Sequence, residues 1–168
     1  MRVATTQNNG RRSFLKALGT TGAVVAAAGA GLLKPVKSLA AKNFPFPKEA
    51  FSKENMDAAL KAAVGTTDIP EGHVSLKAPT IAENGAVVPI TASSDLSSSK
   101  VAKFHIFVAK NPSPYAARFH MLETARPEVS TRIKMGETSD IIAVAETTDG
   151  KLYKASKNVR VTIGGCGG

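Results

Sequence analysis

A single cysteine, Cys166, stands near the end of the chain with two glycines on each side of it. The sequence closes with Gly164-Gly165-Cys166-Gly167-Gly168. A thiolate is a strong nucleophile, and glycine carries no Cβ and allows nearly all backbone conformations. We therefore predict a thin, flexible C-terminal arm over residues 164–168, with Cys166 as the attachment site for a covalent group.

Nothing in the tail would activate this thiol for catalysis. A nucleophilic cysteine enzyme needs a nearby base or a positive field, and the neighbours of Cys166 are glycines and the C-terminal carboxylate. The activating groups should then lie on other enzymes, so we expect a non-catalytic carrier. One alternative is an exported structural or adhesion protein with an idle tail. Another is a ubiquitin-like carrier that uses a Gly-Gly thiocarboxylate, although the cysteine and the export signal argue against it.

The N-terminus has the three-part layout of an export signal. Arg11-Arg12-Ser13-Phe14-Leu15-Lys16 precedes an apolar stretch over 17–33, and Ser38-Leu39-Ala40 is a small-x-small cleavage site. The paired arginines resemble the twin-arginine signal, which exports folded proteins. The apolar stretch is short and rich in Gly and Ala, so we expect no stable membrane anchor. We predict that residues 1–40 are a removed leader and that the mature protein is periplasmic.

Charge and composition exclude several function classes. The chain has a net charge of +9, but residues 1–40 hold six of its 22 Lys and Arg and none of its 13 acids, which leaves 16 against 13 in the remainder. That remainder shows no basic stripe with stacking aromatics, so we expect no nucleic-acid binding. His73, His105 and His120 are widely spaced, and no phosphate-binding loop or haem motif occurs. We accordingly expect no metal site and no cofactor.

The mature chain has the size of one domain, which we place at residues 41–163. Apolar residues at helical spacing predict a helix from about Ser52 to Val64, which Gly65 would end. From His73 onward, short alternating runs separated by turn residues predict an antiparallel β-sandwich of about seven strands. The predicted strands cover residues 74–78, 88–92, 101–110, 118–122, 128–135, 139–147, 152–155 and 159–163.

The strand that contains Lys103-Phe104-His105-Ile106-Phe107-Val108 is apolar on more than one face. Phe104, Ile106 and Val108 form one face, while His105 and Phe107 lie on the other. A sandwich strand needs only one apolar face. Phe107 therefore predicts either a surface that a partner covers or a central strand whose outer face the N-terminal helix seals.

Further motifs accompany the leader. They are Ile81-Ala82-Glu83-Asn84-Gly85 with Val88-Pro89-Ile90, the turn Lys110-Asn111-Pro112-Ser113-Pro114, and the terminal Val161-Thr162-Ile163-Gly164-Gly165-Cys166-Gly167-Gly168. Together they resemble the SoxY family, the sulfur-carrier subunits of the periplasmic thiosulfate-oxidising Sox system. The resemblance covers the whole mature chain.

This resemblance implies an immunoglobulin-like sandwich that forms a heterodimer with SoxZ. Cys166 would be the attachment site, and Gly164, Gly165, Gly167 and Gly168 would form a swinging arm. The SoxAX cytochrome would join thiosulfate to the thiol, SoxB would hydrolyse the terminal group to sulfate, and SoxCD, where present, would oxidise the remaining sulfur. Docking to these enzymes would be transient.

Overall fold

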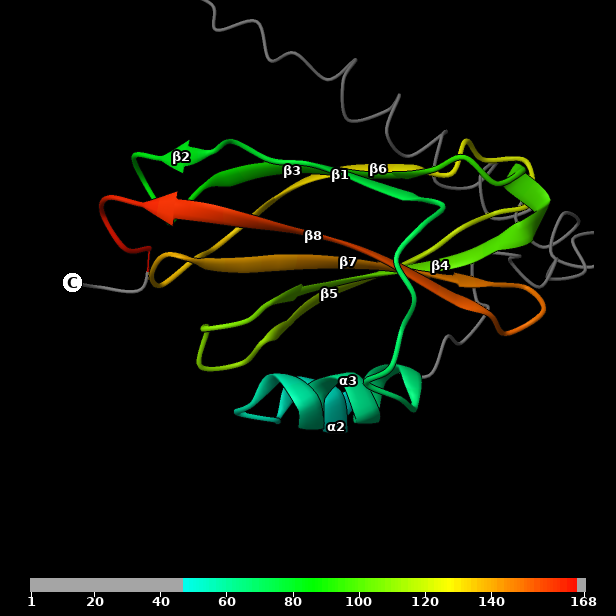
Figure 1. The fold of residues 1–168 in the computed structure, drawn as a ribbon, viewed down its shortest axis with the longest axis horizontal. Coiled ribbons are helices and arrows are strands. Elements are labelled where there is room, and N and C mark those ends of the chain that lie inside the picture. The colour runs from blue at the N-terminus through cyan, green and yellow to red at the C-terminus, as the bar shows by residue number, and fades with distance from the viewer. Residues whose placement is uncertain (1–46, 166–168) are drawn as a thin grey trace, which may run out of the picture. The chain divides into compact units, whose positions relative to one another are not determined.

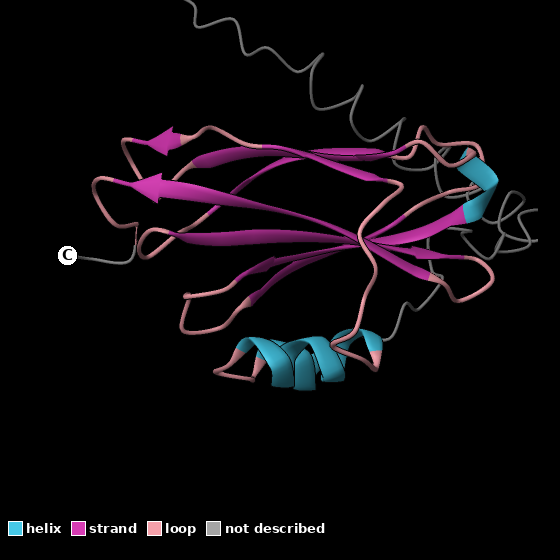
Figure 2. Cartoon of the chain, in the orientation of Figure 1, coloured by secondary structure: helices cyan, strands magenta, loops and turns pink. Residues whose placement is uncertain are grey.

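The computed structural model describes residues 47–165, which lie within one compact unit. Two β-sheets face one another and two helices cover the outer side of one of them (Figures 1 and 2). One sheet has the strand order β1-β3-β6 and the other β2-β8-β7-β4-β5. The strands are β1 (Val74–Lys77), β2 (Ile81–Ala82), β3 (Val88–Ser94), β4 (Val101–Val108), β5 (Tyr115–His120), β6 (Glu128–Ile133), β7 (Ser139–Thr147) and β8 (Leu152–Val161).

The main core fills the space between the sheets, as alternation along the strands predicts. Phe104, Ile106 and Val108 of β4 point into it and are fully buried. Residues on the facing strand β3 and the neighbouring strand β7 complete it, among them Val88, Ile90, Ile141 and Ala143. The predicted mainly antiparallel sandwich is confirmed, with one difference: β2 pairs with β8 in parallel.

The helical region begins earlier than the predicted helix over 52–64 and is divided into two helices. Helix α2 (Lys48–Phe51) precedes α3 (Met56–Val64), whose N-terminus is capped where the Asn55 side chain accepts a hydrogen bond from the Ala58 amide at 2.8 Å. Gly65 ends α3 in the left-handed conformation, at φ 84°, as expected of a C-terminal glycine. No helix among residues 47–165 is long and apolar enough to cross a membrane.

Phe107 is completely buried, so the prediction of a partner surface at this residue is wrong. Helices α2 and α3 cover it, and its ring lies 4.9 Å from that of Tyr115 in a second core that also contains Ala59 and Leu60. Because the helices bring their own apolar face, the outer side of β4 needs no other protein to cover it. The alternative, a central strand sealed by the N-terminal helical segment, is the observed arrangement.

A buried polar group adjoins this second core. His105 is only 1% exposed, and its Nδ1 lies 2.8 Å from the Tyr115 hydroxyl, while its Nε2 lies 3.1 Å from Glu146 Oε2. The hydrogen bond from His105 lowers the pKa of Glu146 to about 2, and burial lowers the pKa of His105. An ionised carboxylate only accepts, so His105 Nε2 donates to Glu146 and Nδ1 accepts from Tyr115. His105 is thus a neutral structural histidine.

Candidate functional site at the root of the C-terminal arm

The C-terminal segment does not leave the sandwich at the end of β8. The end of β8 and the residues after it run beside residues 80–85: the Arg160 amide donates to Thr80 O at 3.0 Å, and the Thr162 amide donates to Ala82 O at 3.1 Å. The Thr162 hydroxyl also donates to Glu83 O at 2.9 Å. The parallel pairing of β2 with β8 therefore extends past both strands, toward the cysteine.

Three backbone hydrogen bonds then bring three separate segments together. The Gly85 amide donates to Ile163 O at 2.7 Å, and the Met135 amide donates to Gly85 O at 2.7 Å. The Gly165 amide in turn donates to Met135 O at 2.9 Å. We call the segments 84–86, 134–136 and 163–165 the arm root, because the chain passes directly from them to Cys166.

The arm root is packed backbone against backbone. A Cβ on Gly165 would lie 2.4 Å from the main chain of Gly85 and from the Ala86 amide nitrogen, and a Cβ on Gly164 would lie 2.3 Å from Gly136 O. A Cβ on Gly85 would lie 2.3 Å from Met135 O. Main-chain atoms cannot move aside as a flexible side chain does. Glycine is required at these three positions because a side chain would collide with the main chain of a neighbouring segment.

Two asparagines brace the turns of the arm root. Asn84 Oδ1 accepts a hydrogen bond from the Ala86 amide at 2.8 Å, which forms a local Asx turn. Asn111 bridges the opposite side: its Nδ2 donates to Lys134 O at 2.8 Å and its Oδ1 accepts from the Gly136 amide at 3.0 Å. The 81–85 motif, the 110–114 turn and the terminal motif, which are far apart in the sequence, thus meet at one place.

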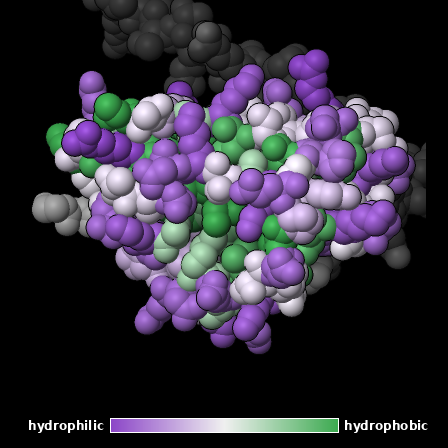
Figure 3. Space-filling view, in the orientation of Figure 1, coloured by the Kyte–Doolittle hydropathy of each residue, from purple (hydrophilic) through white to green (hydrophobic). Residues whose placement is uncertain are grey.

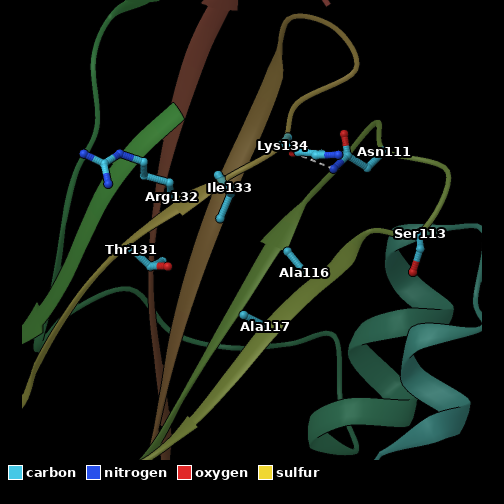
Figure 4. A pocket seen from close by; sticks show the side chains of 8 residues that line it. All are labelled: Asn111, Ser113, Ala116, Ala117, Thr131, Arg132, Ile133 and Lys134. Carbon is cyan, nitrogen blue, oxygen red and sulfur yellow. Dashed lines mark hydrogen bonds between the residues drawn. The ribbon is translucent and has the colours of Figure 1, made fainter. Parts of the chain in front are cut away.

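A pocket of about 290 Å³ lies beside the Asn111 bridge, between the edge strands β5 and β6 (Figure 4). Ala116 and Ala117 line it from β5, and Thr131 and Ile133 line it from β6. In Figure 4 the Arg132 side chain points away from the alanines, and the dashed line marks the bond from Asn111 to Lys134. Among the described residues that line it, the ionisable side chains are Arg132 and Lys134, so the pocket offers the arm root no carboxylate and no imidazole.

Exposed aliphatic side chains surround the arm root. Ile81 and Val87 flank the 84–86 turn and are 53% and 52% exposed, and Ile163 is 69% exposed. The space-filling view shows small apolar areas among polar ones at the end of the sandwich where β8 ends in Figure 1 (Figure 3). We call Ile81, Val87 and Ile163 the apolar rim.

The structure brings together only part of the predicted site. Cys166, Gly167 and Gly168 lie outside the described residues. Gly164 and Gly165, predicted to belong to the flexible arm, are half-buried against the domain. The reason is close backbone packing, which sequence reasoning did not foresee. Gly85 lies in the 81–85 motif, which is the sequence signal for its role, whereas Gly136 lies in none of the motifs named above.

The predicted absence of a metal site rested on the spacing of the three histidines. Pairing of β4 with β5 sets His105 opposite Arg118 and His120 opposite Lys103, so each histidine has one cationic residue across from it. Burial and these cations lower the pKa of His120. Among residues 47–165, no three His, Cys, Asp or Glu side chains are grouped so that they could hold a metal ion.

Comparisons with known proteins relate the chain to one family and to several solved structures. The model of the family "Sulfur oxidation protein SoxY" matches residues 60–166, so the match ends on the cysteine. The solved structure of the sulfur carrier protein SoxY from Chlorobium limicola f. thiosulfatophilum is 39% identical, with a TM-score of 0.56 over 68% of this chain and 97% of that one. A superoxide reductase from Ignicoccus hospitalis is 14% identical, with a TM-score of 0.46 over 54% of this chain and 80% of that one. No curated protein matches the chain.

Proposed function

Because the chain belongs to the SoxY family of sulfur oxidation proteins, we propose that it holds the sulfur intermediates of thiosulfate oxidation as covalent adducts of Cys166. The observation that carries the proposal is the family match, which extends through the arm root to the only cysteine of the chain. The similar protein from Chlorobium is itself a sulfur carrier protein. A carrier role in sulfur oxidation fits a thiol that follows directly after the hydrogen-bonded arm root.

The chemistry requires an oxidant for loading and water for release. Loading joins the thiol to the outer sulfur of thiosulfate, Cys–SH + S2O3²⁻ → Cys–S–S–SO3⁻ + H⁺ + 2e⁻, and a cytochrome of the SoxAX type would accept the two electrons. Hydrolysis by an enzyme of the SoxB type would then give Cys–S–S⁻, sulfate and two protons. The part of the arm root that is described offers main-chain amides and carbonyls to this chemistry, so the carrier is non-catalytic in this proposal.

Assembly and location are part of the same proposal. The partner subunit would be SoxZ, with transient docking to SoxAX, SoxB and SoxCD, and the compartment would be the periplasm. The twin-arginine-type leader over 1–40 supports this location, and it lies outside the described residues. Since Phe107 is buried beneath α2 and α3, the SoxZ interface must use another surface.

Intact mass after reaction with tetrathionate tests the proposal directly. Tetrathionate carries its own oxidising equivalent, RS⁻ + S4O6²⁻ → RS–S–SO3⁻ + S2O3²⁻, so no enzyme is required. We expect one adduct on the mature wild-type protein and none on Cys166→Ser, because no other thiol is present. Treatment with dithiothreitol should remove the adduct.

Two outcomes would contradict the proposal. An adduct that persists on Cys166→Ser would show that another residue is the attachment site. The second outcome concerns removal of the adduct. If a periplasmic extract from cells grown on thiosulfate never removes the adduct that tetrathionate forms on the wild-type protein, an exported structural protein with an idle tail is favoured.

A further inference from the structure

We infer that the arm root holds the chain in a fixed position up to Gly165, and we call this fixed support the seat. Gly85 and Asn111 are its positioning residues, and the backbone bonds whose rotation can move Cys166 begin at Gly165. The inference rests on the proposed function only in naming Cys166 as the carrier thiol. It changes where the swinging part of the molecule begins: Gly164 and Gly165 belong to the domain.

The first argument is the continuity of backbone hydrogen bonds up to Gly165. Pairing begins at Thr80 beside Arg160 and continues without a break through Gly85 and Ile163 to the Gly165 amide. Two of these bonds involve Gly85, once as donor and once as acceptor, both at 2.7 Å. A segment held in this way has the backbone hydrogen bonds of the end of a β-strand, which a loose terminus does not have.

The second argument is the lack of space around Gly85. This residue is buried between Met135 O, the Gly165 amide nitrogen and the Val161 side chain, which an added Cβ would approach to 2.3, 2.8 and 2.9 Å. Any side chain at position 85 must therefore push the 163–165 segment or the 134–136 segment away. Because Cys166 follows Gly165 directly in the chain, a shift of 163–165 moves the thiol with it.

The third argument is the Asn111 bridge, which holds the opposite side of the seat. Its amide group links Lys134 O and the Gly136 amide, so the intervening Met135 O is kept in place to accept from Gly165. Both of these side-chain hydrogen bonds of Asn111 go to the 134–136 segment. Asn111 acts on the arm through the 134–136 segment, which makes it a positioning residue.

The seat limits how far the thiol can travel. One Cα–Cα step of about 3.8 Å separates Gly165 from Cys166, whereas an arm that began after Ile163 would have three such steps and a reach of roughly 10 Å. An enzyme that encloses Cys166 must then come within a few ångströms of the arm root. The apolar rim would form part of that contact, since Ile163 and Val87 flank the seat.

A nitroxide maleimide on Cys166 tests the seat, because the chain has one cysteine and the label adds at a single place. Electron paramagnetic resonance of unloaded protein reports the mobility of the label. We expect narrower lines, from faster label motion, in Gly85→Ala and in Asn111→Ala than in wild type. The matched control is Gly136→Ala, whose added Cβ would meet only Asn111 Oδ1, at 3.8 Å, and whose spectrum should equal that of wild type.

Each result decides for or against the seat. Circular dichroism and thermal unfolding show whether a variant is folded; if Gly85→Ala is not, Asn111→Ala and Gly164→Ala carry the test. Identical spectra for wild type, the folded variants and the control would overturn the inference, as would a wild-type spectrum as narrow as that of a free labelled peptide. The experiment uses no sulfur chemistry, so its failure leaves the tetrathionate result intact, and a failed tetrathionate reaction leaves the seat intact.

Discussion

The helix-covered face of the five-stranded sheet and the arm root achieve close packing in opposite ways. Under α2 and α3, large side chains such as Phe107 and Tyr115 fill the space, and the polar atoms of His105 find partners among other side chains. At the arm root, main-chain atoms of Gly85, Gly165 and Met135 make the contacts between the segments. The comparison teaches that glycine can mark a rigid contact as readily as a flexible one.

The largest effect should come from emptying the side-chain-packed region. Phe107→Ala removes a fully buried ring, so we expect a loss of about 3–5 kcal/mol in the free energy of unfolding, measured by urea denaturation. Val87→Ala, at a half-exposed position, is the control and should change stability by about 0.5 kcal/mol or less. A Phe107→Ala variant as stable as wild type would mean that the helices do not cover this residue in solution.

A smaller, pH-dependent effect should follow from the polar group on the same face. The folded pKa of Glu146, about 2, lies below its ordinary value because His105 and Lys103 hydrogen-bond to the carboxylate. The ionised carboxylate therefore stabilises the fold at pH 5 and above, and this contribution is lost as the pH falls toward 2. Burial of neutral His105 acts in the same direction, since the unfolded chain binds a proton below about pH 6.5.

Glu146→Gln isolates the carboxylate. We expect the variant to lose about 2 kcal/mol at pH 7, and to show a smaller further loss than wild type between pH 5 and pH 3. Denaturation midpoints at pH 7, 5, 4 and 3 measure both quantities. Parallel pH curves for the two proteins would show that Glu146 is not the group responsible.

The smallest effect on stability should come from substitutions in the arm root. These substitutions nevertheless test most sharply the difference between packing by side chains and packing by main-chain atoms. One methyl group on Gly165 meets the Gly85 backbone at 2.4 Å, so Gly165→Ala should cost about 1 kcal/mol, while Gly136→Ala should cost less. If the only reason for glycine at position 165 were a narrow channel in an enzyme that encloses Cys166, alanine would be tolerated there. Only larger residues would then impair sulfur transfer. Equal melting temperatures for Gly165→Ala and Gly136→Ala would remove the distinction between a seated and a free glycine.

Most of the fold could be predicted from side-chain pattern. Alternation identified the core faces of β3, β4 and β7, and helical spacing found the apolar face of α3. Strand β2 has two residues and no room for a pattern, and β8 was predicted as two strands because its middle residues are polar and partly exposed. The N-cap at Asn55 shortened the predicted helix. Each of these differences concerns a place where backbone pairing or capping outweighs side-chain periodicity.

The site was less predictable for a physical reason. The cysteine and its glycines marked the chemistry, but the contact between Gly85 and Gly165 joins residues far apart in the chain and leaves no periodic signal. Asn111 likewise looked like a turn residue, and its bridge joins it to Lys134 and Gly136, which lie 23 and 25 positions further along the chain. Phe107 showed the converse: its apolar character was evident, whereas what covered it was not.

Amide hydrogen exchange at Gly165, followed residue by residue by NMR in the unloaded wild-type protein, tests the central claim most directly. The account predicts that this amide exchanges slowly, with protection comparable to that of the Thr162 amide, because it donates to Met135 O. Exchange at the rate of an unstructured glycine would contradict it, since the thiol would then swing from the end of β8 and the arm would have no seat.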